Sequence, residues 1–228
     1  MKHLILLFLL FSSKISMGQF AIISDKDGWC NIRSSEKIAD NIQDKLNNGH
    51  LVYCYERQGN WVNADYSKSG NDKNGYVYFD RLKYVSAYTK IPLTIESIGR
   101  VVLSKDSISI ILTKKRFDKT NKQLTYNREY KDVLEKINGK KIWGTDGEVP
   151  KSEYQSIEMY LGKRKISLPA AAFANCYEPN LVSTEANYDS ANDILYIHSA
   201  NSDGAGYYEV IWKIEKGVYK ERLVASAF

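Results

Sequence analysis

The stretch 27-DGWCNIRSS-35 follows an Asp-Gly turn signal with alternating apolar and polar side chains. Side chains of a strand alternate between its two faces, so we expect Cys30 and Ile32 to pack inward and their neighbours to face outward. Similar short runs, separated by glycine-containing turn signals, continue from residue 21 to residue 85. Five short strands fit into this span, which predicts a small barrel or sandwich.

Three motifs follow one another in this span. Residues 30–34 read Cys-Asn-Ile-Arg-Ser, residues 59–64 contain Gly-Asn-Trp and then Ala64, and residues 75–82 begin Gly-Tyr-Val and end in Leu82. Together they resemble the bacterial SH3-like family, often called SH3b, over about 65 residues. The resemblance implies a five-stranded barrel over residues 19–88. The sequence departs from the family pattern in placing Cys30 where an aliphatic residue is usual and in a polar insertion at residues 67–74.

The cysteine at this unusual position raises the question of a disulfide. If Cys30 and Cys54 both point into the barrel from neighbouring strands, their α-carbons fall within the roughly 4.4–6.8 Å that a disulfide allows. The alternative is that each is a buried small hydrophobe. Cys176 would then remain without a partner.

The N-terminus has the features of a secretory signal peptide. Lys2 precedes an apolar run from Leu4 to Phe11, and small residues stand at Ser16 and Gly18. Eight apolar residues fall far short of the roughly 20 that span a bilayer, so residues 1–18 are expected to be cleaved. The expected location is periplasmic or extracellular.

Cleavage removes two lysines, which lowers the formal net charge of the chain from +5 to +3. The basic cluster at residues 114–116 is interpreted as solvated loop charge, and no nucleic-acid partner is predicted.

Residues 89–228 are predicted to form a second, β-rich domain of unknown function. Residues 84–92 form the joint between the two domains and contain no flexible Gly/Ser tether, which favours close packing. The strands predict an antiparallel sandwich or curved sheet with one face packed and the other partly wet. One helix is expected over residues 126–139, because Tyr130, Val133, Leu134 and Ile137 have helical spacing before Asn138-Gly139.

Two groups of residues are candidates for chemistry in this second domain. Cys176 with His198 would serve a cysteine hydrolase, but the surrounding residues lack the peptidase turn, so a buried cysteine is the favoured interpretation. No metal site or cofactor is predicted, because no His, Cys, Asp or Glu pair has ligand spacing on one element. Asp146 and Asp203 lie in the glycine turns 144-GTDGEVP-150 and 201-NSDGAGYY-208. These turns offer a binding loop, although hairpin chemistry alone explains them. Similar turns follow an SH3-like front in other exported bacterial proteins, a resemblance that implies no function.

Aromatic residues are the strongest indication of function. Large rings present apolar area and a polar handle, which suits contacts with peptides or sugars. The leading hypothesis is therefore an exported, non-enzymatic binding protein that contacts wall peptide or another envelope protein. An extracytoplasmic inhibitor or immunity-type protein that acts through the second domain is the alternative, and a cysteine hydrolase comes last. The candidate binding residues are Trp29, Tyr53, Tyr55, Trp61, Tyr76 and Tyr78.

Overall fold

The fold is built almost wholly from short antiparallel strands. The computed structural model describes residues 18–226, so the predicted signal peptide lies outside the described residues except for Gly18. This part of the chain holds twenty strands, and its helical segments are 3-10 turns of three residues each. The prediction of a mainly β protein is therefore confirmed. None of the helices between residues 18 and 226 has the length and apolar character needed to span a bilayer.

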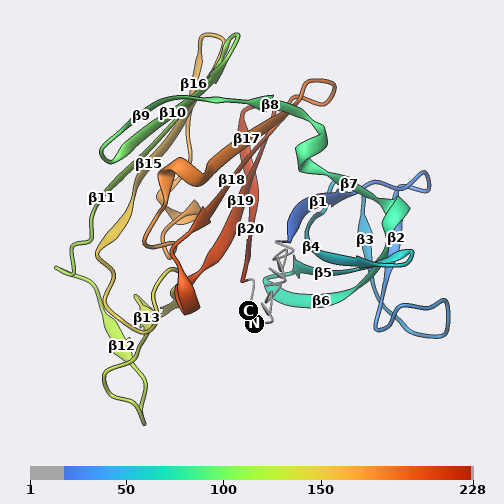
Figure 1. The fold of residues 1–228 in the computed structure, drawn as a ribbon, viewed down its shortest axis with the longest axis horizontal. Helices are drawn as coiled ribbons and strands as arrows, with labels where there is room; N and C mark the ends of the chain where they lie inside the picture. The colour runs from blue at the N-terminus through green and yellow to red at the C-terminus, as the bar shows by residue number, and fades with distance from the viewer. Residues whose placement is uncertain (1–17, 227–228) are drawn as a thin grey trace, which may run out of the picture.

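Seven strands of the front half form one curled sheet, here named the barrel sheet (Figure 1). Its spatial order is β3-β2-β6-β5-β4-β1-β7, and its inner side buries alternate residues such as Ile32, Val52 and Val77. The sequence indicated only five strands in this span, and β3 is hard to recognise because Leu46 is its single buried residue. The strands are β1 (Gln19–Ile23), β2 (Trp29–Arg33), β3 (Ile42–Asn47), β4 (Leu51–Gln58), β5 (Trp61–Lys68), β6 (Asn71–Tyr78) and β7 (Leu82–Tyr84).

Two further sheets face each other as a sandwich (Figure 1). The outer sheet has the order β16-β15-β11-β10-β9, and the middle sheet has the order β20-β19-β18-β17-β8. Trp212, Ile110 and Met159 are fully buried between them. The outer strands are β9 (Leu93–Ser97), β10 (Arg100–Lys105), β11 (Ile108–Arg116), β15 (Ser152–Leu161) and β16 (Arg164–Ser167). The middle strands are β8 (Thr89–Ile91), β17 (Thr184–Asp189), β18 (Ile194–Asn201), β19 (Tyr208–Glu215) and β20 (Val218–Ala225).

The middle sheet is covered on both faces. One face packs on the outer sheet, and the other carries Tyr196, Ile211 and Leu223 against Phe20 and Tyr53 of the barrel sheet. The prediction of a partly solvent-exposed face is therefore wrong for this sheet, because the barrel sheet covers that face. Every residue of β19 except the last is buried as a result.

Among the described residues, five 3-10 segments lie in the connections between the strands. The 3-10 segments are η1 (Phe79–Arg81), η2 (Val85–Ala87), η3 (Ala170–Ala172), η4 (Leu181–Ser183) and η5 (Gly204–Gly206). The chain leaves the barrel sheet after β7, passes through η2 and enters the middle sheet at β8. The joint therefore adds no free linker between the two halves.

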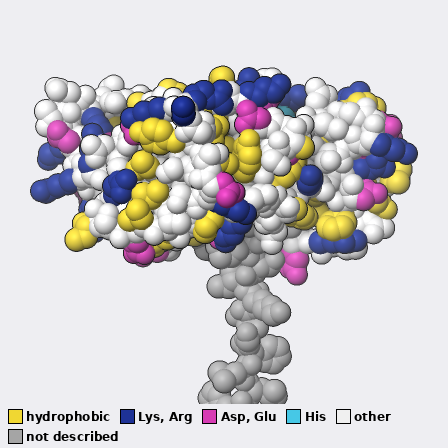
Figure 2. All heavy atoms as spheres, turned by 90° about the horizontal axis from the view of Figure 1, so that it is seen from above, with side chains coloured by type: hydrophobic (Ala, Val, Ile, Leu, Met, Phe, Trp, Pro, Cys, Tyr) yellow, Lys and Arg dark blue, Asp and Glu magenta, His cyan; other side chains and the backbone are white. Residues whose placement is uncertain are grey.

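Basic side chains are dispersed over the face of the molecule that Figure 2 shows. Figure 2 shows one face, on which Lys and Arg side chains alternate with hydrophobic and acidic ones. Within the predicted basic cluster, Lys115 lies 3.4 Å from the Glu153 carboxylate, which also pairs with Lys122 at 2.5 Å. Part of this cluster is thus neutralised locally.

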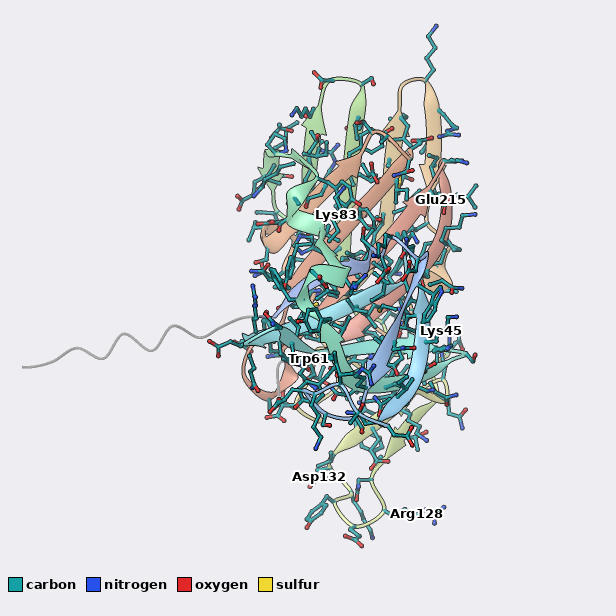
Figure 3. The ribbon with its side chains drawn as sticks, turned by 90° about the vertical axis from the view of Figure 1, so that its right-hand side faces the viewer. Lys45, Trp61, Lys83, Arg128, Asp132 and Glu215 are labelled. Atoms are coloured by element: carbon teal, nitrogen blue, oxygen red, sulfur yellow. The ribbon has the colours of Figure 1, made fainter. Side chains whose placement is uncertain are left out.

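The predicted helix over residues 126–139 is wrong. A small three-stranded sheet occupies this region, formed by β12 (Leu124–Tyr126), β13 (Leu134–Ile137) and β14 (Lys140–Lys141). The Asn127 side chain accepts hydrogen bonds from the backbone amides of Glu129 and Tyr130, which favours a turn at that point. Tyr130 and Val133 are exposed, so the apolar stripe that a helix would bury does not form. We name residues 118–150 the flap, and its tip near Arg128 and Asp132 projects beyond the rest of the molecule (Figure 3).

The proposed Cys30–Cys54 disulfide is absent. Both cysteines are free thiols in the barrel core, and Cys176 is a free thiol in the sandwich core. β2 and β4 are not neighbours, because β6 and β5 lie between them in the sheet. The disulfide required the two cysteines to lie on neighbouring strands, and they do not.

Candidate functional site

An open groove on the barrel sheet gathers three of the six aromatic candidates. Trp29, Trp61 and Tyr78 line a cavity of about 400 Å³, which we name the aromatic groove. This volume falls in the range of small-ligand pockets, about 300–1,000 Å³. Figure 3 views the barrel sheet from the side that faces away from the sandwich and labels Trp61 there. The remaining lining residues are Asp25, Asp27, Cys30, Asn31, Arg33, Ile38 and Arg81.

The rings of the aromatic groove are held by strand pairing. Trp61 of β5 stands opposite Tyr78 of β6, and their rings meet edge to face at 4.9 Å between centroids. Trp29 begins β2, and the Lys45 ammonium lies 3.3 Å from its ring centroid. Such a cation-π contact contributes on the order of 0.5–1 kcal/mol at an exposed site. The rings are thus positioned before any ligand arrives.

Charged groups border the aromatic groove in fixed positions. The Arg81 guanidinium donates to the buried Asp25 carboxylate at 2.6 Å. The same carboxylate accepts the backbone amide of Asp27 at 2.7 Å, and Asn48 bonds to both backbone groups of Asp25. Arg33 donates through Nη1 to the Asn41 side chain at 2.9 Å. The groove therefore offers both signs of charge beside its rings.

The thiol that lines the aromatic groove is not a nucleophile. Burial, together with the nearby Asp25 carboxylate, raises the pKa of the Cys30 thiol to about 12. A thiol reacts as its thiolate, so Cys30 stays protonated and inert at neutral pH. Its role is to fill the core beside the groove.

The other three aromatic candidates do not line this groove. Tyr53 is fully buried between the barrel sheet and the middle sheet, where its hydroxyl donates to Glu209 at 2.9 Å. Tyr55 packs beside it and donates to Asp65 at 2.5 Å. Tyr76 is half-buried opposite Arg33. Strand alternation placed Tyr53 and Tyr55 outside the barrel core, but sequence alone did not show that a second sheet covers that side.

Sequence reasoning also missed several groove residues. Asp25, Arg81 and the exposed Ile38 come from turns that connect the strands. The charged run Ser24-Asp25-Lys26-Asp27 before the Asp-Gly turn was the available signal for the acidic side. Arg81 carried no such signal, because its contact with Asp25 spans 56 residues.

Cys176 and His198 do not form a catalytic pair. Cys176 is buried in the core between the outer and middle sheets, and burial raises its pKa to about 11. His198 alternates with the inward Ile197 and Ser199 of β18, and its ring contacts Phe20 on the barrel side of the middle sheet. The two side chains thus lie on opposite faces of that sheet. His198 instead faces Glu185 at 3.6 Å.

Asp146 and Asp203 come together, although 57 positions separate them in the sequence. Both line one pocket, to which the flap contributes Asp146 and the turn after β18 contributes Asp203. In the described part of the chain, no three His, Cys, Asp or Glu side chains are close enough to hold a metal ion.

Comparisons with protein-family models, curated proteins and solved structures found no match.

Proposed function

We propose that this chain is an exported, non-enzymatic binding protein whose SH3-like barrel binds a cell-envelope ligand, a wall peptide or a segment of another envelope protein. The observation that carries the proposal is the convergence of Trp29, Trp61 and Tyr78 on one open groove. Residues 1–18 support export, since they have the charge, apolar run and small residues of a cleaved signal.

The chemistry of the aromatic groove suits a short extended peptide. Ring faces and edges bind aliphatic side chains at low entropy cost, and aromatic-lined grooves are a recurring mode of peptide recognition. Arg33 and Arg81 offer donors to a carboxylate, and Asp27 offers an acceptor to an amine. A peptide that carries both charged groups fits this border better than a purely apolar ligand.

Retention on isolated cell wall tests the proposal. Trp29→Ala and Tyr78→Ala should each weaken retention about ten-fold or more, as expected for aromatic residues at the centre of a binding site. Tyr130→Ala is the matched control, because Tyr130 is an exposed ring on the flap, away from the groove. The bound and free fractions are measured by pulldown, and the melting temperature of each variant shows whether it folds.

Two results would count against wall binding. Equal retention of wild type and both groove variants would place the contact elsewhere on the molecule. Absence of retention in all proteins would exclude the wall and leave an envelope protein as the ligand, to be sought by crosslinking through the groove.

A further inference from the structure

Strand β9 is a free edge of the outer sheet. It pairs with β10 on one side, and within residues 18–226 no strand pairs with its other side. All five of its side chains are exposed, including those of Leu93 and Ile95. Figure 1 places the β9–β10 hairpin on the side of the molecule away from the barrel sheet. The edge of β9 is therefore open to another strand.

The side chains of β9 lack the charges that protect many edges. Exposed lysines and arginines commonly keep edge strands from pairing with other chains. At the opposite edge of the outer sheet, β16 carries Arg164 and Lys165. β9 carries a single charged residue, Glu96, next to the half-exposed Ile95. Of these two edges, β9 is the one that favours pairing.

An apolar stripe on the outer face of this sheet ends at Ile95. Ile95 stands opposite Val102 of β10, and Val102 stands opposite Ile111 of β11. Val101 and Leu103 point into the sandwich core, so strand alternation turns Val102 to the outer face. Ile95 is the most exposed member of the stripe. A second sheet joined to this edge would cover it.

The sequence of β9 is complementary to itself in the antiparallel direction. Ile95 is the middle residue of the strand, so two copies related by a two-fold axis at Ile95 pair along their whole length. In this register Ile95 meets its own counterpart, Leu93 meets Ser97, and Thr94 meets Glu96. An axis at Glu96 would instead place two like charges opposite each other, which is unfavourable.

A projection and a recess lie on either side of this axis. Ile98, in the turn after β9, is fully exposed. Pro92 and Leu93 line an open pocket of about 550 Å³, here named the edge pocket, with further apolar walls from Leu103 and Val182. With the axis at Ile95, Ile98 of one copy falls opposite Pro92 of the other. Two-fold symmetry repeats the contact, so each copy gives one isoleucine and receives one.

The charged groups of the edge pocket are already paired within the chain. The Glu185 carboxylate lies 3.4 Å from the Lys90 ammonium and 3.6 Å from Nε2 of His198. Glu209 accepts a hydrogen bond from the buried Tyr53 hydroxyl at 2.9 Å. A charged ligand would have to compete with these pairs. An apolar side chain therefore fits the edge pocket better.

We propose that this protein forms a two-fold dimer in which β9 pairs antiparallel with β9 of a second copy. The two five-stranded outer sheets join edge to edge, and each Ile98 packs into the edge pocket of the other copy. This interface uses no residue of the aromatic groove, so it can be tested separately from the proposed ligand binding.

Two features keep the interface short. Pro92 has no amide to donate, which ends the pairing at Leu93. Thr94 is an extra residue in the register with β10, which bends the strand. The paired segment is thus limited to five residues and the two Ile98 contacts. We expect a weak dimer that dissociates on dilution.

Sedimentation velocity of the chain without residues 1–18 tests the proposal. The average mass should rise from one copy toward two between about 10 μM and 1 mM, as expected for a small interface. Ile95→Lys should weaken the dimer at least about ten-fold, because two lysines would meet at the axis. Val218→Lys is the matched control, since Val218 is similarly exposed on the edge strand β20, and it should dimerise like wild type. The melting temperature of each variant shows whether it folds.

Cysteine crosslinking tests the register. The three native thiols are buried, so an introduced cysteine is the one that reacts. Ile95→Cys places two cysteines opposite each other with α-carbons about 4.5–5.5 Å apart, within the range of a disulfide. Ile98→Cys is the control, because it is more exposed but its two copies lie about 20 Å apart, six residues along the paired strands. Under mild oxidation, Ile95→Cys should form the covalent dimer and Ile98→Cys should not.

Several results would overturn the proposal. A wild type that stays a single copy up to about 1 mM would exclude the second copy as the occupant and leave this edge to a strand of another protein. Equal dimerisation of Ile95→Lys and wild type, or equal weakening by Val218→Lys, would place the contact outside β9. Crosslinking of Ile98→Cys as fast as that of Ile95→Cys would refute the register.

Discussion

Cys30 and Cys54 share the barrel core but belong to strands that are not neighbours. Their chemistry follows mainly from burial. Removal from water disfavours the thiolate, which raises the pKa of each of these thiols to about 12. These cysteines therefore behave as small hydrophobes, the alternative that the sequence had left open.

We expect all three native thiols to react with iodoacetamide only when the chain unfolds. Labelling at pH 8 should be slow in buffer and fast in denaturant, and intact mass should show three free thiols. The pKa of each thiol is higher in the folded chain than in the unfolded chain. Well below pH 9 the thiols are therefore protonated in both states and leave the free energy of unfolding unchanged. As the pH rises through the folded pKa values, they lower the free energy of unfolding. A mass two hydrogens lower, or rapid labelling of native Cys30, would contradict the structure.

At the scale of elements, the turns decide where side chains meet. The β15–β16 hairpin and the Gly144 turn both place glycine at positive φ, 61° at Gly162 and 104° at Gly144. The two glycines differ in their surroundings. A Cβ added at Gly162 would have no atom near it, whereas a Cβ added at Gly144 would clash with the Tyr177 carbonyl. The first turn serves only the hairpin, and the second also shapes the pocket that Asp146 and Asp203 line.

We expect Gly144→Ala to be much more destabilising than Gly162→Ala. The left-handed conformation alone costs an alanine about 1–2 kcal/mol, which is the expected loss at Gly162. At Gly144 the clash with the backbone adds about 1–3 kcal/mol. Urea unfolding of the two variants measures the difference. Equal losses would mean that the Gly144 turn moves freely away from Tyr177.

The flap shows where sequence periodicity is ambiguous. Leu134 and Ile137, three positions apart, are both buried against Phe117 and Tyr177. A helix would also place two residues at this spacing on one buried face. The two ends of β13 reach the same small core because the register between β12 and β13 shifts between Thr125 and Tyr126, which leaves Glu135 of β13 as an extra residue. Two buried residues three positions apart do not distinguish a helix from an irregular strand in so short a segment.

At the scale of the whole molecule, the middle sheet joins the two halves. Its barrel-facing side buries Tyr196, Ile211 and Leu223, and the Lys213 ammonium donates to the Gly49 carbonyl at 2.8 Å. Tyr53 and Glu209 add a buried hydrogen bond across the same boundary. Such a shared core favours cooperative unfolding of the barrel sheet and the sandwich.

We expect Ile211→Ala to destabilise both halves together. Truncation of a buried isoleucine costs about 2–5 kcal/mol, and this side chain faces the barrel sheet. Hydrogen exchange followed by mass spectrometry should show faster exchange in barrel and sandwich peptides alike. Ile197→Ala, on the opposite face, is the control for a loss inside the sandwich. Barrel peptides that exchange at the wild-type rate in Ile211→Ala would show that the halves unfold independently.

The sequence by itself determined the local features of this protein. Alternation and glycine turns specified the inward Ile32 and Cys30, the hairpin around Gly162 and β20 over Val218–Ala225. These features depend on neighbours along the chain, so pattern is sufficient. Only the tertiary structure decided which strands are neighbours, which tyrosines remain exposed and which turns meet. Trp29 and Tyr78 line one groove, and Tyr53 with Glu209 and Gly144 with Ser202 are hydrogen-bonded, although all of these residues come from distant segments. They depend on how sheets pack in space, which no local periodicity encodes.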